Sequence, residues 1–320
     1  MRVRRTRTMA PMIVVAGEAL IDLLVDPGGG LTATAGGGPF NTARTIARLG
    51  GQVAYLGCLS SDRFGSTLRQ ALIGDGVDLS LALTTDAPTT LAIAELDERG
   101  AATYRFHTAE TSAPQVGPEA VVAALATQPQ ALHLGTLGLV LEPIASALAS
   151  GVADASSTTL VMLDPNCRPA VIADRTAYLA RLDAVIARAD VVKVSVDDLA
   201  YLDPGAATVD AARDIARRGP QVVLLTDGGR AVVVVAGDGT FEVPVPQVPV
   251  VDSVGAGDAF GGGFLARWIE RGLGRTDLAD AAVLRDTVAL AIEVASVTCQ
   301  RAGADPPRRE ELGWPPVVGA

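Results

Sequence analysis

The sequence predicts a doubly wound α/β protein, in which helices flank both faces of a mostly parallel sheet, with a small β-sheet lid beside it. From about residue 115, short apolar segments alternate with helical ones, which is typical of parallel strands that are covered on both faces. Polar or glycine-rich turns follow several of these segments, where α/β proteins bind their ligands. The extended segments near 20–35 and 90–107 have no crossover helices, so we expect them to form a separate sheet.

The composition excludes several classes of protein. Of the 320 residues, 49% are hydrophobic and 19% are charged, so the chain can bury a large core without disulfides or a metal ion. With a net charge of −10 and no apolar run long enough to span a bilayer, we expect no nucleic-acid and no membrane partner. Three widely separated cysteines, Cys58, Cys167 and Cys299, indicate a reducing compartment, and we expect a cytoplasmic protein.

In the first half of the chain, the predicted strands outnumber the helices. An apolar run, Met12–Ala16, predicts a buried strand. Apolar residues at helical spacing predict helices over Phe40–Leu49, stopped by Gly50-Gly51, and over Arg63–Ile73. The turn signature Asp97-Glu98-Arg99-Gly100 predicts a hairpin. The remaining strands are expected over Ile21–Val25, Val53–Leu56, Leu91–Leu96 and Thr103–Phe106.

In the second half, helices and strands alternate regularly. Helical spacing predicts helices over Val121–Ala126, Ile144–Ala149, Tyr178–Ala187, Val209–Arg217, Asp258–Glu270 and Ala281–Val297. Continuous apolar runs predict buried strands over Ala131–Leu134, Leu160–Leu163, Val191–Val194 and Val222–Leu225. Val232–Val235 and Thr240–Val243 are joined around Gly237-Asp238-Gly239, which predicts an antiparallel hairpin added to the sheet.

These elements divide the chain into two structural units and two tails. The main α/β domain is expected from three segments, residues 12–20, 36–88 and 108–310. The small β lid is expected from two segments, residues 21–35 and 89–107. Residues 1–11 and 311–320 are expected to be tails.

The most informative motif is Gly255-Ala256-Gly257-Asp258, which lies between an apolar extended stretch and a predicted helix. Free N–H groups and the dipole at a helix N-terminus favour an anion, and the glycines let a phosphate approach the backbone. Asp258 could then act as general base for a hydroxyl that attacks this phosphate. The alternative is an ordinary turn with Asp258 as a helix cap. Gly261-Gly262-Gly263 favours a special role, because each glycine destabilises a helix by about 1 kcal/mol unless backbone or ligand packs closely there.

A second glycine-rich segment, Gly36-Gly37-Gly38-Pro39-Phe40-Asn41, opens the helix predicted over Phe40–Leu49. Its glycines allow a polar ligand to come close, and Asn41 offers a donor and an acceptor for sugar hydroxyls. Ordinary helix-start chemistry, with Pro39 in the first turn, explains the segment at least as well.

Three further strand ends carry polar groups. Asp164-Pro165-Asn166-Cys167-Arg168-Pro169 follows an apolar strand, and its arginine could hold a phosphate. In Lys193-Val194-Ser195-Val196-Asp197-Asp198, Asp198 could organise Mg²⁺ through water. Thr226-Asp227-Gly228-Gly229-Arg230 could hold nucleotide phosphates. Each segment by itself is at least as typical of a turn or a helix cap as of a ligand site.

Together these segments resemble the PfkB, or ribokinase-like, family of carbohydrate kinases. The resemblance extends from about Val14 to Pro307, and among the members it is greatest to the fructokinases. The C-terminal signature is matched by Val251-Asp252-Ser253-Val254-Gly255-Ala256-Gly257-Asp258-Ala259-Phe260. The N-terminal signature is matched by Gly36–Asn41, Arg48-Leu49-Gly50 and Asp62-Arg63-Phe64-Gly65, and the likeness to fructokinases is carried by Gly17-Glu18-Ala19-Leu20-Ile21-Asp22, Pro39 and Asp164–Pro169.

The resemblance implies an ATP-dependent sugar kinase of known fold. Asp258 would be the catalytic base, Gly255, Ala256 and Gly257 would form the anion hole for the γ-phosphoryl group, and Arg168 would help to bind phosphate. The residues that would contact the sugar are Asp22, Gly37, Gly38 and Asn41, with Arg105 from the lid. The residues that would line ATP, with Mg²⁺ nearby, are Lys193, Asp198, Thr226 and Gly228. Asp252, the carbonyl of Val254 and Gly303 match a monovalent-cation site, for K⁺, and the lid would also be a homodimer surface.

The acceptor that the resemblance favours is a primary hydroxyl of a fructose-like sugar. Within the family, 2-keto-3-deoxygluconate kinase, ribokinase and nucleoside kinase are alternatives. From another class, a sugar-binding protein without catalysis would keep the cleft but would not need Asp258. A dehydrogenase is disfavoured, because no Gly-x-Gly-x-x-Gly follows the first strand.

Overall fold

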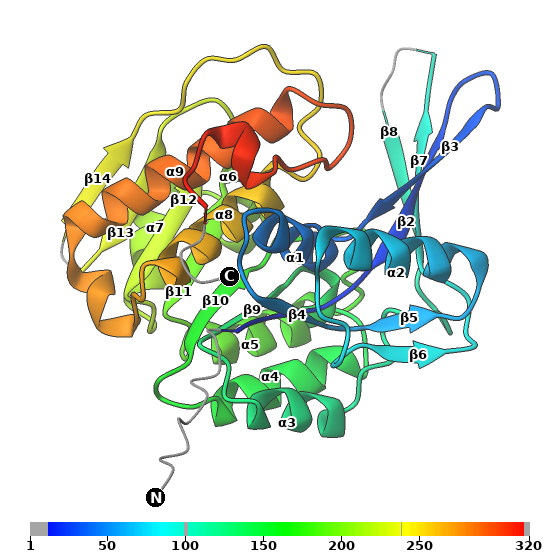
Figure 1. Ribbon diagram of the computed structural model, residues 1–320, viewed down its shortest axis with the longest axis horizontal. Coiled ribbons are helices and arrows are strands. Elements are labelled where there is room, and N and C mark those ends of the chain that lie inside the picture. Colours follow the sequence, from blue (N-terminus) through cyan, green and yellow to red (C-terminus); the bar gives the residue numbers. More distant parts are fainter. Residues whose placement is uncertain (1–11, 99–101, 238, 317–320) are drawn as a thin grey trace, which may run out of the picture.

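A large twisted sheet with helices on both faces forms the body of the protein, and a second sheet projects from one end (Figure 1). The computed structural model describes residues 12–98, 102–237 and 239–316. The predicted N-terminal tail, the middle of each predicted hairpin turn and the last four residues therefore lie outside the described residues. In the part that is described, no helix is both long enough and apolar enough to cross a membrane.

The main sheet has eight strands in the order β14-β13-β12-β11-β10-β9-β1-β4. Six of them, from β12 to β4, run parallel, and β13 and β14 are added as the predicted antiparallel hairpin. The strands are β1 (Ile13–Ala16), β4 (Val53–Leu56), β9 (Ala131–Gly135), β10 (Leu160–Asp164), β11 (Val191–Ser195), β12 (Val222–Thr226), β13 (Val232–Ala236) and β14 (Gly239–Val243). All eight were predicted, with ends that agree within one or two residues.

Successive side chains of the parallel strands point into two separate cores, as burial on both faces requires. In β1, Ile13 and Val15 join one core, and Val14 and Ala16 join the other. The first core is covered by α1 (Gly38–Arg48), α2 (Arg63–Asp75), α8 (Ala256–Glu270) and α9 (Ala281–Cys299). The second is covered by α3 (Pro118–Ala126), α4 (Ile144–Asp154), α5 (Arg175–Ile186), α6 (Val196–Leu202) and α7 (Thr208–Ala216).

The projecting sheet comes from the two segments that lack crossover helices. Its strands are β3 (Leu31–Gly36), β2 (Leu20–Val25), β7 (Leu91–Leu96) and β8 (Ala102–His107), in that order. One face carries Asp22, Ala92 and Phe106, which are register partners across the sheet. Because Leu20, Ala92 and Phe106 on this face pack with Leu137, this face is turned toward the main domain.

Helix α8 contains the three consecutive glycines, and close helix packing accounts for two of them. A Cβ at Gly262 would lie 2.7 Å from Cβ of Thr45 on α1, and a Cβ at Gly263 would lie 3.1 Å from a methyl carbon of Val294 on α9. The neighbouring helices thus approach the α8 backbone where side chains are absent. The packing offsets the intrinsic cost of glycine within a helix.

Several elements of the structure were not predicted. They are α6, the two-stranded sheet of β5 (Cys58–Ser60) and β6 (Leu83–Thr85), and the 3₁₀ turns η1 (Thr136–Leu139), η2 (Arg275–Ala279) and η3 (Arg309–Leu312). The predicted C-terminal tail also begins too early, because Leu312 and Trp314 pack against the first core. Cys58, Cys167 and Cys299 are all unpaired, as expected.

Candidate active site

The carboxyl ends of the parallel strands and the first turns of α1 and α8 bring most of the predicted site residues together. Glu18 follows β1, Thr136 follows β9, and Asp164 ends β10. Asn41 lies in the first turn of α1 and Asp258 in the first turn of α8. In an α/β sheet this edge is where strand ends and helix N-termini leave room for a ligand.

Asp258 and Asn41 meet at the centre of the site. Nδ2 of Asn41 donates a hydrogen bond of 2.9 Å to Oδ2 of Asp258, although 217 positions separate the two residues. Both side chains are buried, and Oδ1 of Asn41 has no partner among the described residues. Within the described part of the chain, Oδ1 of Asp258 accepts no hydrogen bond, which leaves it free to meet a ligand.

The backbone at the start of α8 leaves donors for an anion. Gly255 has φ of 76°, in the left-handed region, and a Cβ there would lie 2.4 Å from Cβ of Ala304. Among the described residues no side chain caps the first turn. The amide of Ala256 donates to the carbonyl of Ser253 at 3.2 Å, whereas the amide of Gly257 keeps its donor capacity. The turn therefore presents the free amide of Gly257 beside the buried carboxylate of Asp258.

Burial is the main influence on the acidity of Asp258, whose pKa it raises from 3.8 to about 6. The hydrogen bond from Asn41 opposes this rise because it stabilises the charged form. The negative charge of Asp164 adds to the rise, and the positive charges of Lys193 and Arg168 oppose it. A carboxylate with a pKa near 6 is mostly ionised at neutral pH and remains basic enough to take a proton.

Lys193 lies beneath the Gly255–Asp258 turn, where α8 begins. Its Nζ is 2.8 Å from Oδ2 of Asp164, and both side chains are buried. A Cβ at Gly257 would lie 2.8 Å from this same Nζ, so the glycine lets the ammonium group approach the turn from inside the protein. The structure therefore groups Lys193 with Asp164 and Asp258, whereas the resemblance placed it with the nucleotide.

Asp22 lies on the face of the small sheet that is turned toward the main domain, and Arg168 on the loop after β10 is near enough for its charge to act on it. Burial raises the pKa of Asp22 to about 6, and the positive charge of Arg168 opposes that rise. A Cβ at Gly36 would lie 2.0 Å from Oδ2 of Asp22, so this position of the strand has no room for a side chain. Arg168 itself is exposed and is held by Asn166, whose left-handed backbone has φ of 38°.

Two of the predicted sugar residues supply backbone rather than side chains. Gly37 has φ of 110°, and a Cβ there would lie 2.7 Å from the carbonyl oxygen of Glu18. A Cβ at Gly38 would lie 2.6 Å from Cγ2 of Thr136 and 3.3 Å from Oδ1 of Asp258. Both glycines thus lie where segments from β1, β9 and α8 converge.

Arg105 does not join the other predicted sugar residues. Its Nε is 3.2 Å from Oε2 of Glu95, and both side chains are largely exposed. Register places Arg105 beside Ile93 and Leu23, on the face of the small sheet opposite Asp22. Sequence spacing alone did not distinguish the two faces, since Arg105 and Phe106 are neighbours in the chain.

Asp198 performs a structural task in this arrangement. One oxygen accepts hydrogen bonds from the amide and hydroxyl of Ser195, and the other accepts from the amide of Cys167. These contacts form the capping box of α6 and tie it to the loop after β10. Direct ligation of an ion by Asp198 would have to displace them.

A cavity of about 550 Å³ is lined by neither Thr226 nor Gly228, the other predicted nucleotide residues. Its lining includes the stretch from Val243 to Val248 and one face of α9 around Ile292. Gln247 in this stretch donates a 3.2 Å hydrogen bond to the carbonyl of Gly229, which connects it to the Thr226–Gly229 turn. Gly228 in that turn has φ of 52° and open space around it.

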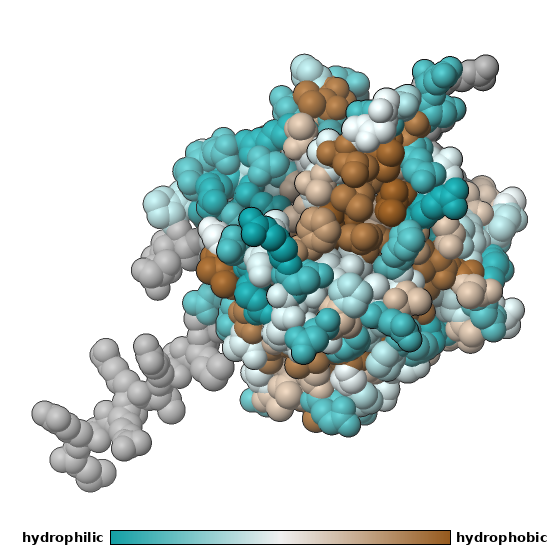
Figure 2. All heavy atoms as spheres, turned by 90° about the vertical axis from the view of Figure 1, so that its right-hand side faces the viewer, coloured by the Kyte–Doolittle hydropathy of each residue, from teal (hydrophilic) through white to brown (hydrophobic). Residues whose placement is uncertain are grey.

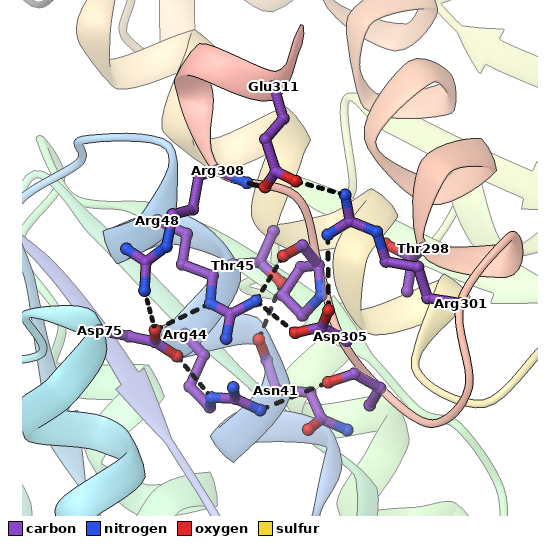
Figure 3. A network of polar contacts seen from close by, with 12 residues as sticks. Asn41, Arg44, Thr45, Arg48, Asp75, Thr298, Arg301, Asp305, Arg308 and Glu311 are labelled. Carbon is purple, nitrogen blue, oxygen red and sulfur yellow. Dashed lines mark hydrogen bonds and ion pairs between the residues drawn. The ribbon is translucent and has the colours of Figure 1, made fainter.

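The residues of the predicted cation site are also brought together. Oδ1 of Asp252 accepts from the amide of Val254 at 3.0 Å, and Oδ2 accepts from the amide of Gly303 at 2.9 Å. The loop that contains Gly303 continues to Asp305, which Arg48 of α1 binds at 2.6 Å. Figure 3 shows this arginine-rich network, in which Arg44 reaches the carbonyl of Ala304. The network fixes the loop that packs on Gly255.

Glu18 is the site residue that the sequence reasoning missed. It is 3% exposed and accepts hydrogen bonds from Thr136, Gly38 and Gly138. Its place in the sequence could have indicated a functional role, because it comes directly after the glycine that follows a buried strand. Acidic residues are rarely buried unless their carboxyl groups are paired with other groups.

The family model of the pfkB carbohydrate kinases matches residues 10–311. This chain belongs to the pfkB family. It is therefore a phosphotransferase that uses an alcohol acceptor, and not a binding protein without catalysis. The predicted family and fold are both confirmed, and the site described above occupies the part of the chain that the family model covers.

Individual relatives narrow the class of kinase. Fructokinase of Rhizobium leguminosarum bv. trifolii is 33% identical over 259 residues, which cover 80% of this chain and 79% of that one. The structure of Xylella fastidiosa fructokinase with bound ATP has a TM-score of 0.86 at 30% identity, covering 94% and 96% of the two chains. That of Vibrio cholerae O395 fructokinase with fructose, ADP and a calcium ion has a TM-score of 0.82 at 25% identity, covering 95% and 98%. This pfkB-family protein is a fructokinase-like sugar kinase.

Proposed function

We propose that this pfkB-family enzyme transfers the γ-phosphoryl group of ATP to a primary hydroxyl of a fructose-like sugar, with Asp258 as general base. The observation that carries the proposal is the pairing of a buried carboxylate with uncapped amides in the first turn of α8. The relatives with bound ATP, ADP and fructose support the choice of nucleotide and sugar.

Proton removal and phosphoryl transfer occur together at Asp258. Its carboxylate accepts the proton of the sugar hydroxyl while the hydroxyl oxygen attacks the γ-phosphorus. The bond from that phosphorus to the β-phosphate bridging oxygen breaks, and ADP leaves. Asn41 holds one carboxylate oxygen in place, so the other faces the reacting hydroxyl.

The anion hole stabilises the charge on the group in transfer. Gly255, Ala256 and Gly257 let the phosphoryl oxygens come close to backbone amides at the helix N-terminus. The buried ammonium of Lys193 adds a fixed positive charge behind Gly257. Arg168, on the exposed loop after β10, would pair with phosphate once ATP and sugar are both bound.

Sugar and nucleotide approach this point from opposite sides. Asp22, Gly37, Gly38 and Asn41 form the sugar side, where carboxylate, amide and open backbone suit hydroxyl groups. The cavity between residues 243–248 and α9 forms the nucleotide side, and its largely apolar lining suits a nucleobase. Gln247 connects this stretch to the turn of Thr226 and Gly228. The small sheet would close over the sugar as a lid.

Magnesium would enter with ATP. Among the described residues no three His, Cys, Asp or Glu side chains gather as a ready metal site, so the ion would rely on the phosphates for most of its ligands. Oδ1 of Asp164 is a buried carboxylate oxygen without a partner, which makes it the group that fits an ion or its water. The ion would neutralise phosphate charge. Asp252, Val254 and Gly303 would hold K⁺.

The outward face of the small sheet fits a second copy of this chain. Its apolar residues are Val25, Leu31, Ala33 and Ile93, of which Leu31 is 71% exposed, whereas Leu23 on the same face packs against the first core. Figure 2 shows an apolar patch on the side of the molecule where this sheet lies. We propose a homodimer through this face, in a cytoplasmic enzyme, and Leu31→Glu should convert it to a monomer in analytical ultracentrifugation.

The substrate is tested by measuring ADP release with fructose, ribose, 2-keto-3-deoxygluconate and adenosine as acceptors, each over a range of concentrations. Fructose should give the highest kcat/KM, and the product should carry its phosphate on a primary hydroxyl, as phosphorus NMR shows. A higher kcat/KM for any other acceptor would replace fructose in the proposal and leave the mechanism in place.

A further inference from the structure

The carboxyl group of Glu18 joins three segments that surround the sugar side of the site. Oε1 accepts from the amide of Gly38 at 3.2 Å, and Oε2 accepts from the amide of Gly138 at 3.1 Å. The hydroxyl of Thr136 donates to the same carboxyl group. Within the described chain no lysine or arginine pairs with Glu18, so a buried acid is held by uncharged donors alone.

The contact with Thr136 holds a backbone conformation that threonine rarely adopts. Thr136 has φ of 51°, in the left-handed region, where the branched Cβ of threonine is unfavourable. Gly135 before it has φ of 157°, and a Cβ there would lie 1.8 Å from the carbonyl oxygen of Asp164. A strained residue persists only where its surroundings fix it, and the Glu18 carboxyl group is the buried partner of this hydroxyl.

The contact with Gly38 fixes the start of α1. Gly37 occupies the N-cap position of this helix and has no side chain to cap it, so Glu18 serves as a cap from 20 positions away. The same first turn contains Asn41, which donates to Asp258. Displacement of this turn would therefore move the donor away from the catalytic carboxylate.

We propose that Glu18 is a positioning residue for phosphoryl transfer: its carboxyl group holds the first turn of α1 and the Thr136 turn so that Asn41 and Gly38 meet Asp258. The inference rests on the proposed function, because it assigns a role relative to Asp258 as base. Glu18 does not touch the reacting atoms in this arrangement and acts through Asn41.

The charges around Glu18 should make the activity depend on pH in a way that a purely structural role of Glu18 would not. Among the described residues, the titratable groups that face it are Asp258 on α8 and Tyr55 on β4, and no positive group does. Burial raises the pKa of Glu18 to about 7, and the charge of Asp258 raises it further. As pH rises through 7, Glu18 ionises and places a second negative charge beside the base. Because two interacting acids titrate as a pair, the pH profile of kcat/KM should have a rising limb at low pH and a falling limb at high pH.

The experiment compares Glu18→Gln and Glu18→Ala with the wild-type enzyme, using the best acceptor and pH values from 5.5 to 9. Glu18→Ala should lower kcat by about 10- to 100-fold with little change in the KM for ATP, because a mispositioned base is the main defect. Glu18→Gln should keep most of the wild-type kcat near pH 6. It should lack the decline of kcat/KM that the wild-type enzyme shows above pH 7. Glu142→Gln, which changes an exposed glutamate near the same turn, should behave as wild type.

An unchanged kcat in Glu18→Ala, or a decline above pH 7 in Glu18→Gln equal to that of wild type, would overturn the inference. If Glu18→Ala does not fold, the pH profile of Glu18→Gln alone decides. If no acceptor gives ADP with the wild-type enzyme, the proposed function fails separately. A crystal structure of Glu18→Gln or Glu18→Ala then decides: an Asn41 displaced from Asp258 in the alanine variant supports the inference, and an unmoved Asn41 overturns it.

Discussion

Replacing Asp258 by asparagine should remove activity and stabilise the fold at the same time. The side chain keeps its size and can still accept the hydrogen bond from Asn41, but it can no longer take a proton. Loss of a general base lowers kcat by about 10²- to 10⁴-fold. The rise in the pKa of Asp258 from 3.8 to about 6 corresponds to about 3 kcal/mol of unfavourable free energy in the folded protein at high pH.

The sign of this stability effect sets its pH dependence. The folded pKa lies above the unfolded value, so the unfavourable energy is absent below about pH 4 and complete above about pH 6. Urea unfolding, followed by tryptophan fluorescence, should therefore show Asp258→Asn more stable than wild type by up to about 3 kcal/mol at pH 8, and by about half that at pH 5.

Two results would refute this reasoning. Turnover of Asp258→Asn within tenfold of wild type would show that Asp258 is not the base. A variant that is inactive and also less stable at pH 8 would show that the carboxylate is held for structural reasons. With the wild-type enzyme, the same pKa predicts that kcat/KM falls below about pH 6, as the base takes up a proton.

Other substitutions test the geometry elsewhere. Gly262→Ala should destabilise the protein by about 1–3 kcal/mol in urea unfolding, because the added Cβ would press on Thr45. The matched change Gly74→Ala in α2, where there is open space, should be neutral or slightly stabilising. Equal effects of the two changes would contradict the packing account. Asp22→Asn should raise the KM for sugar at least several-fold and change kcat less, and an unchanged KM would remove Asp22 from the sugar side. Arg105→Ala should leave the KM for sugar within about twofold, because its guanidinium pairs with an acid on the outward face; a large rise would return it to the site.

Most of the fold follows from patterns that are local in the sequence. The strands of the main sheet are continuous apolar runs, and α8 and α9 are long enough for helical spacing to be clear. Helix α6 was missed because it has only seven residues, and two aspartates follow its first residue, Val196. The strands β5 and β6 have three residues each, too few for a period to appear, and they form through pairing between distant segments.

Site residues could be predicted where a glycine-rich turn opens a helix. They were harder to predict where the site depends on contacts between residues that are distant in the sequence. Asn41 and Asp258 were both predicted because each lies at a glycine-rich turn that opens a helix, but their hydrogen bond to each other was not predicted. Nothing local showed that Lys193 is buried against Asp164, or that Arg105 lies on the outward face, because these depend on sheet register and burial. Glu18 was missed because its three donors come from two distant segments.

The burial of Lys193 has a practical consequence, because it is the only lysine in the sequence. Its amine is sealed in an ion pair with Asp164, so reagents that acylate lysines should leave the side chains of the native enzyme unmodified. A label found on Lys193 by mass spectrometry would then report that the interior beneath the anion hole has opened. One residue thereby serves as a built-in probe of local unfolding, and isotope-labelled lysine would give a single side-chain NMR signal from the same place.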